Sequence, residues 1–280
     1  MEISISSAKQ ILNHHYHQCL EEIAKSKIAI DSANQKWEHS LQVIGAGNYL
    51  LRNQKEYIEE KEEFINICRY SIALHDLGRF KEISLANGFA KELSKHDHGI
   101  YSWEMLKDIY NITDQRILLS VKHHGHMIEE LHNDEEFIKI KDEKLKQEIL
   151  KVAAIVRDAD KIANYHLFFK DAKIIYDINI DNFPESDKFS EVIWQQFINN
   201  EVCSYKHRKS YPDFLLCVLC WIFDIELEAS FKFITKLNLS DSFINLLSEY
   251  IKDENTMIVI KNKVDTYISS KLDKNIMLKA

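Results

Sequence analysis

The sequence predicts an all-α protein, and three observations lead to this prediction. The 280 residues include only six glycines and two prolines, which disfavours the turn-rich sheets of sandwiches and barrels. Apolar residues recur at helical spacing along most of the chain, whereas stretches that alternate apolar and polar residues are rare. Hydrophobic residues make up 45% and charged residues 29% of the chain, a balance typical of globular proteins with a buried core.

In the N-terminal part, we expect helices over residues 7–29, 36–53, 57–76, 98–110, 114–124 and 136–169. Each has apolar residues that share one helix face. In order, these residues are Ile11, Cys19 and Ile23; Leu41, Ile44 and Leu51; Ile65, Tyr70 and Leu74; Trp103, Leu106 and Ile109; Ile117, Leu118 and Val121; and Val152, Ile155 and Ile162. The charge-rich residues 55–63 and 134–148 are interpreted as the solvated faces of helices.

In the C-terminal part, we expect helices over residues 186–201, 211–225, 226–237, 239–252 and 254–272. Asp187 and Ser190 before Val192 are typical of a helix start. Residues 214–223 form the longest apolar run, which indicates a buried helix segment. Within it, Cys217 and Cys220 form a CxxC pair, but their apolar neighbours favour core packing over a zinc site.

The helical pattern lapses around residues 171–188, which suggests a connection between two parts of the chain. We therefore expect a metal-binding helical core over residues 1–170 and an additional C-terminal helical layer over residues 171–280. The C-terminal helices carry strongly apolar faces that need to be covered. For this reason we expect the layer to pack on the core and form one compact unit.

Composition limits the partners and the compartment. The chain has 36 Lys and Arg against 44 Asp and Glu, a formal net charge of -8, so no broad nucleic-acid binding is expected. The longest apolar run is half of the roughly 20 residues that a bilayer requires, so no membrane span is expected. Residues 1–9 show no signal-peptide pattern, and an odd number of cysteines, five, fits a reducing compartment. Together these features predict a cytoplasmic protein.

Histidine and aspartate gather in a few short segments that bear on chemistry. These are His39, His75-Asp76, His98, His123-His124, and Asp158 with Asp160 in an otherwise apolar helix. An imidazole and a carboxylate are unfavourable to bury together unless a cation or a hydrogen-bond network compensates. Imidazole and carboxylate ligands suit manganese, iron, cobalt, nickel or zinc better than calcium. Asp76 has two oxygens and could bridge two cations, so one or two metal ions are both possible.

In this order, the residues resemble the HD superfamily of metal-dependent phosphohydrolases, whose pattern is His, then His-Asp, then a later Asp on successive helices. The motif HDLGR at residues 75–79 is similar to the family's central signature, and the resemblance spans roughly residues 36–165. It implies that His39, His75, Asp76 and Asp160 bind metal. Asp160 is preferred over Asp158 because the family commonly has Ala-Asp at this point, as in Ala159-Asp160. Asp158 would then orient a ligand histidine or cap the helix.

The chain is also similar to the binuclear branches of this superfamily, which include cyclic-dinucleotide phosphodiesterases. His98, His123 and His124 occupy the positions of the additional histidines that hold a second metal in those branches. One such branch has a Gly-Tyr-Pro extension after the histidine pair, and this chain has Gly125-His126-Met127 instead. The resemblance therefore supports a metal centre better than any particular substrate.

The resemblance implies a phosphohydrolase that uses metal-activated water to cleave a phosphoester. The substrate would be a small phosphorylated molecule, a nucleotide or a cyclic nucleotide. Asp76 would bridge the metals, while Arg79 and Lys161 would neutralise charge on a phosphorus-bound oxygen. Two alternatives remain open: a non-catalytic metal-containing module that binds or senses a ligand, and a di-iron oxygenase on an HD-like scaffold.

Overall fold

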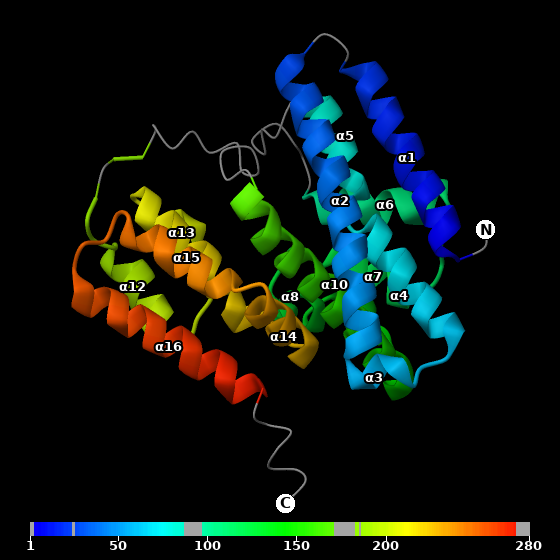
Figure 1. Cartoon of the computed structure of the whole chain (residues 1–280). Coiled ribbons are helices and arrows are strands. Elements are labelled where there is room, and N and C mark those ends of the chain that lie inside the picture. Colours follow the sequence, from blue (N-terminus) through cyan, green and yellow to red (C-terminus); the bar gives the residue numbers. More distant parts are fainter. Residues whose placement is uncertain (1–2, 24–25, 87–96, 171–182, 185, 273–280) are drawn as a thin grey trace, which may run out of the picture. The chain divides into compact units, whose positions relative to one another are not determined.

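The structure is a computed structural model that describes residues 3–23, 26–86, 97–170, 183–184 and 186–272. All regular secondary structure in these ranges is helical, which confirms the all-α class (Figure 1). The chain divides into two compact units, Met1–Ala163 and Asn164–Ala280. The packing of a C-terminal layer on the core stays a prediction of the sequence.

The first unit consists of helices and one π-helical turn, labelled as in Figure 1. They are α1 (Ile5–Glu22), α2 (Lys27–Asn53), α3 (Lys55–Ile58), α4 (Glu62–Leu74), α5 (Leu77–Ala86), α6 (His98–Glu104), the π-helical turn η2 (Met105–Ile109), α7 (Gln115–Lys122), α8 (Ile128–His132), α9 (Glu135–Lys139) and α10 (Glu143–Lys170), which runs on into the second unit. Helices α1, α2 and α4 pack against one another, and α5 packs against α6 (Figure 1).

Several predicted boundaries in this unit are wrong: the expected helix 7–29 ends at Glu22, and the expected helix 57–76 is divided into α3 and α4. Two further errors have a capping residue as their cause. Helix α2 begins at Lys27 rather than at residue 36, because the Ser26 hydroxyl accepts a hydrogen bond from Ala29 N at 3.3 Å. The expected helix 136–169 is divided into α9 and α10. Here the Asp142 carboxylate accepts hydrogen bonds from Lys144 N at 2.9 Å and Leu145 N at 3.2 Å, which starts a new helix.

The second unit contains α12 (Glu191–Ile198), η4 (Tyr205–His207), α13 (Tyr211–Leu219), η5 (Cys220–Asp224), α14 (Glu228–Lys236), α15 (Leu239–Ser248) and α16 (Glu254–Leu272). Its core includes the buried rings of Phe214, Phe231 and Phe243. Cys217 and Cys220 are fully buried, as the sequence predicts. None of the described helices combines the length and the apolar character that crossing a membrane requires.

Gly78 fixes how closely α5 approaches α6. A Cβ atom at this position would lie 2.6 Å from both Ser102 N and Tyr101 Cβ, and closer still to the carbonyl oxygen of His98. Gly78 N also donates a hydrogen bond to Ser102 Oγ at 2.8 Å, and the same hydroxyl donates to the carbonyl oxygen of His75 at 2.9 Å. This close crossing brings the chain around His75 next to the start of α6 at His98.

We expect Gly78→Ala to lower the free energy of unfolding by about 1–3 kcal/mol, because the methyl group meets backbone atoms that cannot move aside individually. The matched control is Gly45→Ala in α2, where a Cβ atom would meet nothing within 4 Å. That variant should raise stability by about 0.5–1 kcal/mol, since alanine is favoured over glycine in a helix. Urea unfolding of both variants is the measurement, and equal midpoints would contradict the close crossing at Gly78.

Candidate metal centre

Asp76 lies at the junction between α4 and α5, after an apolar helix that carries it into the interior. Ile72 and Leu74 on the last turn of α4 are buried, and the following His75 and Asp76 are 0% and 3% exposed. A carboxylate at such a position requires partners of opposite charge or hydrogen-bond donors. Three histidines from other segments, the neighbouring His75 and one further aspartate surround it.

The first group of ligand atoms faces Oδ2 of Asp76. His39 Nε2 from α2 lies 3.5 Å from this oxygen, and His75 Nε2 lies 3.7 Å from it. Asp160 from α10 approaches the same two rings, with its Oδ1 2.9 Å from His39 Nε2 and 3.6 Å from His75 Nε2. Of the two aspartates that the sequence leaves open, the structure brings Asp160 to these histidines.

The second group faces the other oxygen of Asp76. His98 Nε2 from α6 and His124 Nε2, just after α7, each lie 3.3 Å from Asp76 Oδ1. The two ring nitrogens are 3.1 Å apart. The carboxylate of Asp76 is therefore shared, with one oxygen toward each group. We call His39, His75, Asp76, His98, His124 and Asp160 the Asp76 cluster.

Backbone carbonyls set the orientation of two rings in this cluster. His75 Nδ1 lies 2.9 Å from the carbonyl oxygen of Ile72, and His124 Nδ1 lies 2.8 Å from that of Val121. A carbonyl oxygen only accepts, so Nδ1 of each ring carries a hydrogen and donates it. The Nε2 atoms then present their lone pairs to the cluster when the rings are neutral, which is the form that binds metals.

The buried nitrogens of the cluster fit a cation. Within the described ranges, Nδ1 of His39 is buried without a hydrogen-bond partner, and Nε2 of His39 and of His75 face the carboxylate oxygens of Asp76 and Asp160. If His98 and His124 are both neutral with hydrogen on Nδ1, two lone pairs face each other across 3.1 Å. Unpartnered buried polar atoms cost about 1–3 kcal/mol each. A divalent cation bound by these lone pairs would remove that cost, so the donor set suits a metal ion.

The surroundings favour an ionised Asp76 carboxylate and a neutral His98 ring. Burial works to raise the pKa of Asp76, but Lys36, His75 and the other imidazoles together hold this pKa well below its usual value. Burial, followed by the charge of Arg79, holds the pKa of His98 well below its usual value. Asp76 is therefore an anion and His98 a neutral ring at pH 7, as metal binding requires.

Two cations lie beside the shared carboxylate. Lys36 Nζ is 3.1 Å from Asp76 Oδ2, and Arg79 Nε is 3.6 Å from Asp76 Oδ1. Arg79 also donates from Nη1 to Glu82 at 2.6 Å, which fixes its guanidinium. Sequence reasoning missed Lys36. Its signal is its position three residues before His39, which places both side chains on one face of α2.

Three other candidates lie differently from the Asp76 cluster. The structure does not bring the His123 ring to Asp76, because its Nε2 bonds to Asp134 at 2.8 Å. Asp158 is fully buried on α10, two residues before Asp160. Lys161 follows Asp160 directly and is partly exposed.

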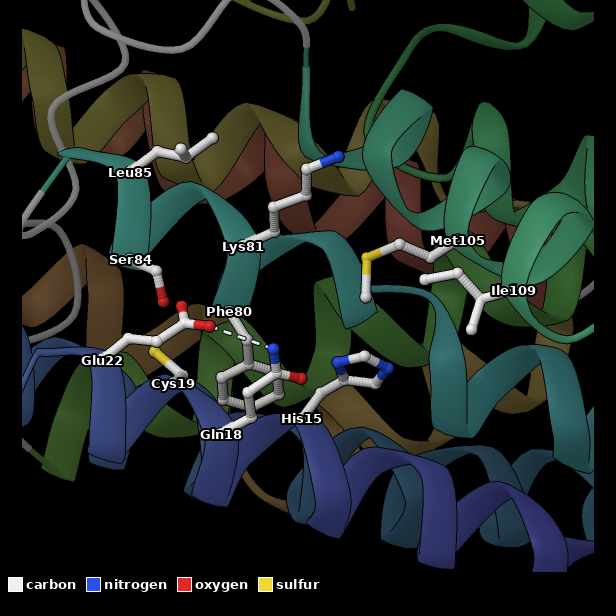
Figure 2. A pocket seen from close by; sticks show the side chains of 10 residues that line it. All are labelled: His15, Gln18, Cys19, Glu22, Phe80, Lys81, Ser84, Leu85, Met105 and Ile109. Atoms are coloured by element: carbon white, nitrogen blue, oxygen red, sulfur yellow. Dashed lines mark hydrogen bonds between the residues drawn. The ribbon is translucent and has the colours of Figure 1, made fainter.

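A pocket of about 350 Å³ lies elsewhere in the first unit. Figure 2 shows its lining side chains, which come from α1, α5 and the segment around η2, among them His15, Glu22, Phe80 and Lys81. No residue of the Asp76 cluster lines it. The cluster is thus recognised by its donor atoms and not by the shape of this pocket.

Comparison with protein families agrees with this geometry. Residues 37–165 match the family model of the HD domain. This chain carries an HD domain. The match contains His39, His75, Asp76 and Asp160, so the resemblance predicted from the sequence is confirmed. A search of curated proteins and a search of solved structures each gave no match.

The HD domain implies a superfamily of metal-dependent hydrolases. The two sets of donors that meet at Asp76, namely His39 with His75 and His98 with His124, could hold metal ions in this HD domain. Asp160 lies against the first set. The matched region ends close to the boundary of the first compact unit at Ala163.

Proposed function

We propose that this HD domain is a phosphohydrolase that cleaves the phosphoester of a nucleotide or cyclic nucleotide in the cytoplasm. The observation that carries the proposal is the division of Asp76 between two sets of histidines, with Oδ2 toward His39 and His75 and Oδ1 toward His98 and His124. A carboxylate shared in this way is suited to bridging two ions. Two ions close together suit displacement at phosphorus, because both the attacking and the leaving oxygen need stabilisation.

The ligands fall into two sets in this proposal. One ion would be held by His39, His75, Asp76 and Asp160, and the other by Asp76, His98 and His124. Imidazole and carboxylate donors favour manganese, iron, cobalt, nickel or zinc. Such a cation supplies a Lewis acid that polarises phosphoryl oxygens and lowers the pKa of water toward about 7.

The cations of the chain have separate tasks in the reaction. Lys36 and Arg79 flank the carboxylate of Asp76 and keep it ionised and oriented. The Lys36 side chain is itself partly exposed and is therefore suited to contact a phosphate oxygen. Arg79 is fixed between Asp76 and Glu82, so its positive charge acts on the phosphate region from a constant position. Lys161 follows Asp160 directly and would add a further positive charge near the phosphate.

The test is hydrolysis with defined metals. The protein is stripped of metal with a chelator and reloaded with manganese, iron, cobalt, nickel or zinc. It should then cleave at least one substrate among nucleotides, cyclic nucleotides and cyclic dinucleotides, and the reaction should not require molecular oxygen. Phosphate or phosphomonoester release is the measurement, and renewed chelation should stop it. Oxygen consumption without ester cleavage would contradict the proposal in favour of a di-iron oxygenase. Metal binding without turnover of any of these substrates would contradict it in favour of a sensor module.

A further inference from the structure

A second group of metal-binding side chains lies outside the Asp76 cluster, where α7 leads into α8. His123 follows the last residue of α7, His126 lies three positions on, and Glu130 is in α8. One ligand atom from each of the three lies within 4.8 Å of the other two. We propose that His123, His126 and Glu130 form a further divalent-cation site, the His126 site, which shares no ligand with the Asp76 cluster.

The orientation of the His123 ring is set by a carboxylate. His123 Nε2 lies 2.8 Å from Asp134 Oδ2, and this carboxylate also accepts from Lys122 Nζ at 2.6 Å. An ionised carboxylate only accepts, so His123 Nε2 donates its hydrogen to it. The lone pair is then on Nδ1, which is buried without a hydrogen-bond partner in the described part of the chain. Histidine ligands of metals commonly donate their other nitrogen to a carboxylate in this way.

The His126 ring has a similar arrangement. Its Nε2 faces Asp97 Oδ2 at 3.7 Å, while its Nδ1 faces Glu130 Oε2 at 3.4 Å. Nδ1 of His126 is also buried and, within the described residues, has no hydrogen-bond partner. One buried Nδ1 thus lies beside the Glu130 carboxylate, and His123 of the same three-residue group holds a second buried Nδ1 without a partner in the described part of the chain. Glu130 is exposed, so an ion can reach the site from solvent.

The chemistry of the three ligands selects the class of ion. Two imidazole nitrogens and one carboxylate oxygen suit zinc, cobalt or nickel better than magnesium or calcium, which prefer oxygen alone. The carboxylates of Asp97, Glu130 and Asp134 supply negative charge around the site.

Positive charge also lies near this site. Lys122 is paired with Asp134, and Arg157 donates from Nη1 to the carbonyl oxygen of His126. The three carboxylates outnumber these two cations, so the local charge still favours a divalent ion.

The arrangement around His126 could also be explained without a metal, by a doubly protonated His126 ring that hydrogen-bonds both Asp97 and Glu130. It accounts for the carboxylates on either side of this ring. It does not account for His123. The Nε2 atom of this ring donates to Asp134, and its Nδ1 is buried without a hydrogen-bond partner in the described part of the chain. A cation bound by both Nδ1 atoms explains both rings at once.

The test compares two neighbouring glutamates of α8. In Glu130→Gln, bound zinc per chain after equilibrium dialysis should fall by about one equivalent relative to the unmodified protein, or its dissociation constant should rise at least about tenfold. The matched control is Glu129→Gln, which removes the same charge from a position that is also exposed and should leave zinc binding unchanged. Both side chains are exposed, so neither substitution should disturb folding. Equal zinc stoichiometry and affinity in the two variants would overturn the proposal.

A second comparison separates the His126 site from the Asp76 cluster. Asp76→Asn should keep the equivalent of zinc that Glu130→Gln loses, and the visible absorption of bound cobalt from this site should persist in it. If Asp76→Asn and Glu130→Gln both lost the same single equivalent of zinc, the His126 site would not be independent of the Asp76 cluster, and the proposal would be overturned. Because the readout is metal binding, failure of the phosphohydrolase proposal leaves this result unaffected.

Discussion

Replacing Asp76 with asparagine is expected to abolish metal-dependent hydrolysis and to remove metal from both groups of the Asp76 cluster. Each oxygen of Asp76 faces a different pair of histidines, at 3.3–3.7 Å from their Nε2 atoms. An amide keeps the volume but supplies neither the negative charge nor a second anionic oxygen. We therefore expect hydrolysis to fall by several orders of magnitude even with metal in excess.

The control for this experiment is Asp31→Asn, the same chemical change at an exposed position of α2. It should leave metal content and hydrolysis unchanged. Far-ultraviolet circular dichroism should show a retained helical fold in both variants, because the apolar face of α4 still holds the segment in place. Near-wild-type turnover from Asp76→Asn would refute a bridging role for this carboxylate.

Substitution of His124 or His98 by alanine is expected to lower bound metal from about two equivalents to about one. His124 and His98 contribute only to the group at Asp76 Oδ1, whereas His39, His75 and Asp160 remain at Oδ2. Hydrolysis should be lost with the second ion if both ions act on the phosphate. Metal analysis and turnover, both measured in the Glu130→Gln background, report on the Asp76 cluster alone.

The matched control is His166→Ala, which removes an exposed imidazole of α10 and should change neither quantity. Two independent variants guard against a folding defect, since His98 lies in α6 and His124 in the turn after α7. An unchanged metal content with hydrolysis intact in both variants would assign these histidines a purely structural role. In that case one ion, bound at His39, His75 and Asp160, would suffice.

Helix periodicity predicted most of the fold because apolar spacing is local in sequence. The expected helix 254–272 coincides with α16, and the expected helix 98–110 covers α6 and η2. Boundaries set by a single capping side chain were harder to predict. Ser26 and Asp142 each start a helix inside a stretch whose apolar pattern alone suggested otherwise.

The ordered histidines and aspartates also indicated the metal centre, because each follows or lies within an apolar helix that carries it inward. The sequence could not distinguish His123 from His124, since adjacent residues leave a helix end in different directions. Val121 and Asp134 decide their orientations, and only the folded chain brings Asp134 to His123. Lys36 was missed because its partner, Asp76, is 40 positions away in the sequence.

Asp97, at the start of α6, lies between the two proposed metal-binding regions. Its Oδ1 accepts from Gly99 N at 2.7 Å and faces His98 Nδ1 at 3.5 Å, while its Oδ2 faces His126 Nε2 at 3.7 Å. A cation on either ring makes its remaining N–H more acidic and orders the same carboxylate for the other ring. The loss of Asp97 side-chain freedom then occurs only once for two binding events. If both regions bind metal, we therefore expect Asp97 to couple their affinities, equally in both directions, without making either site depend on the other for its ligands.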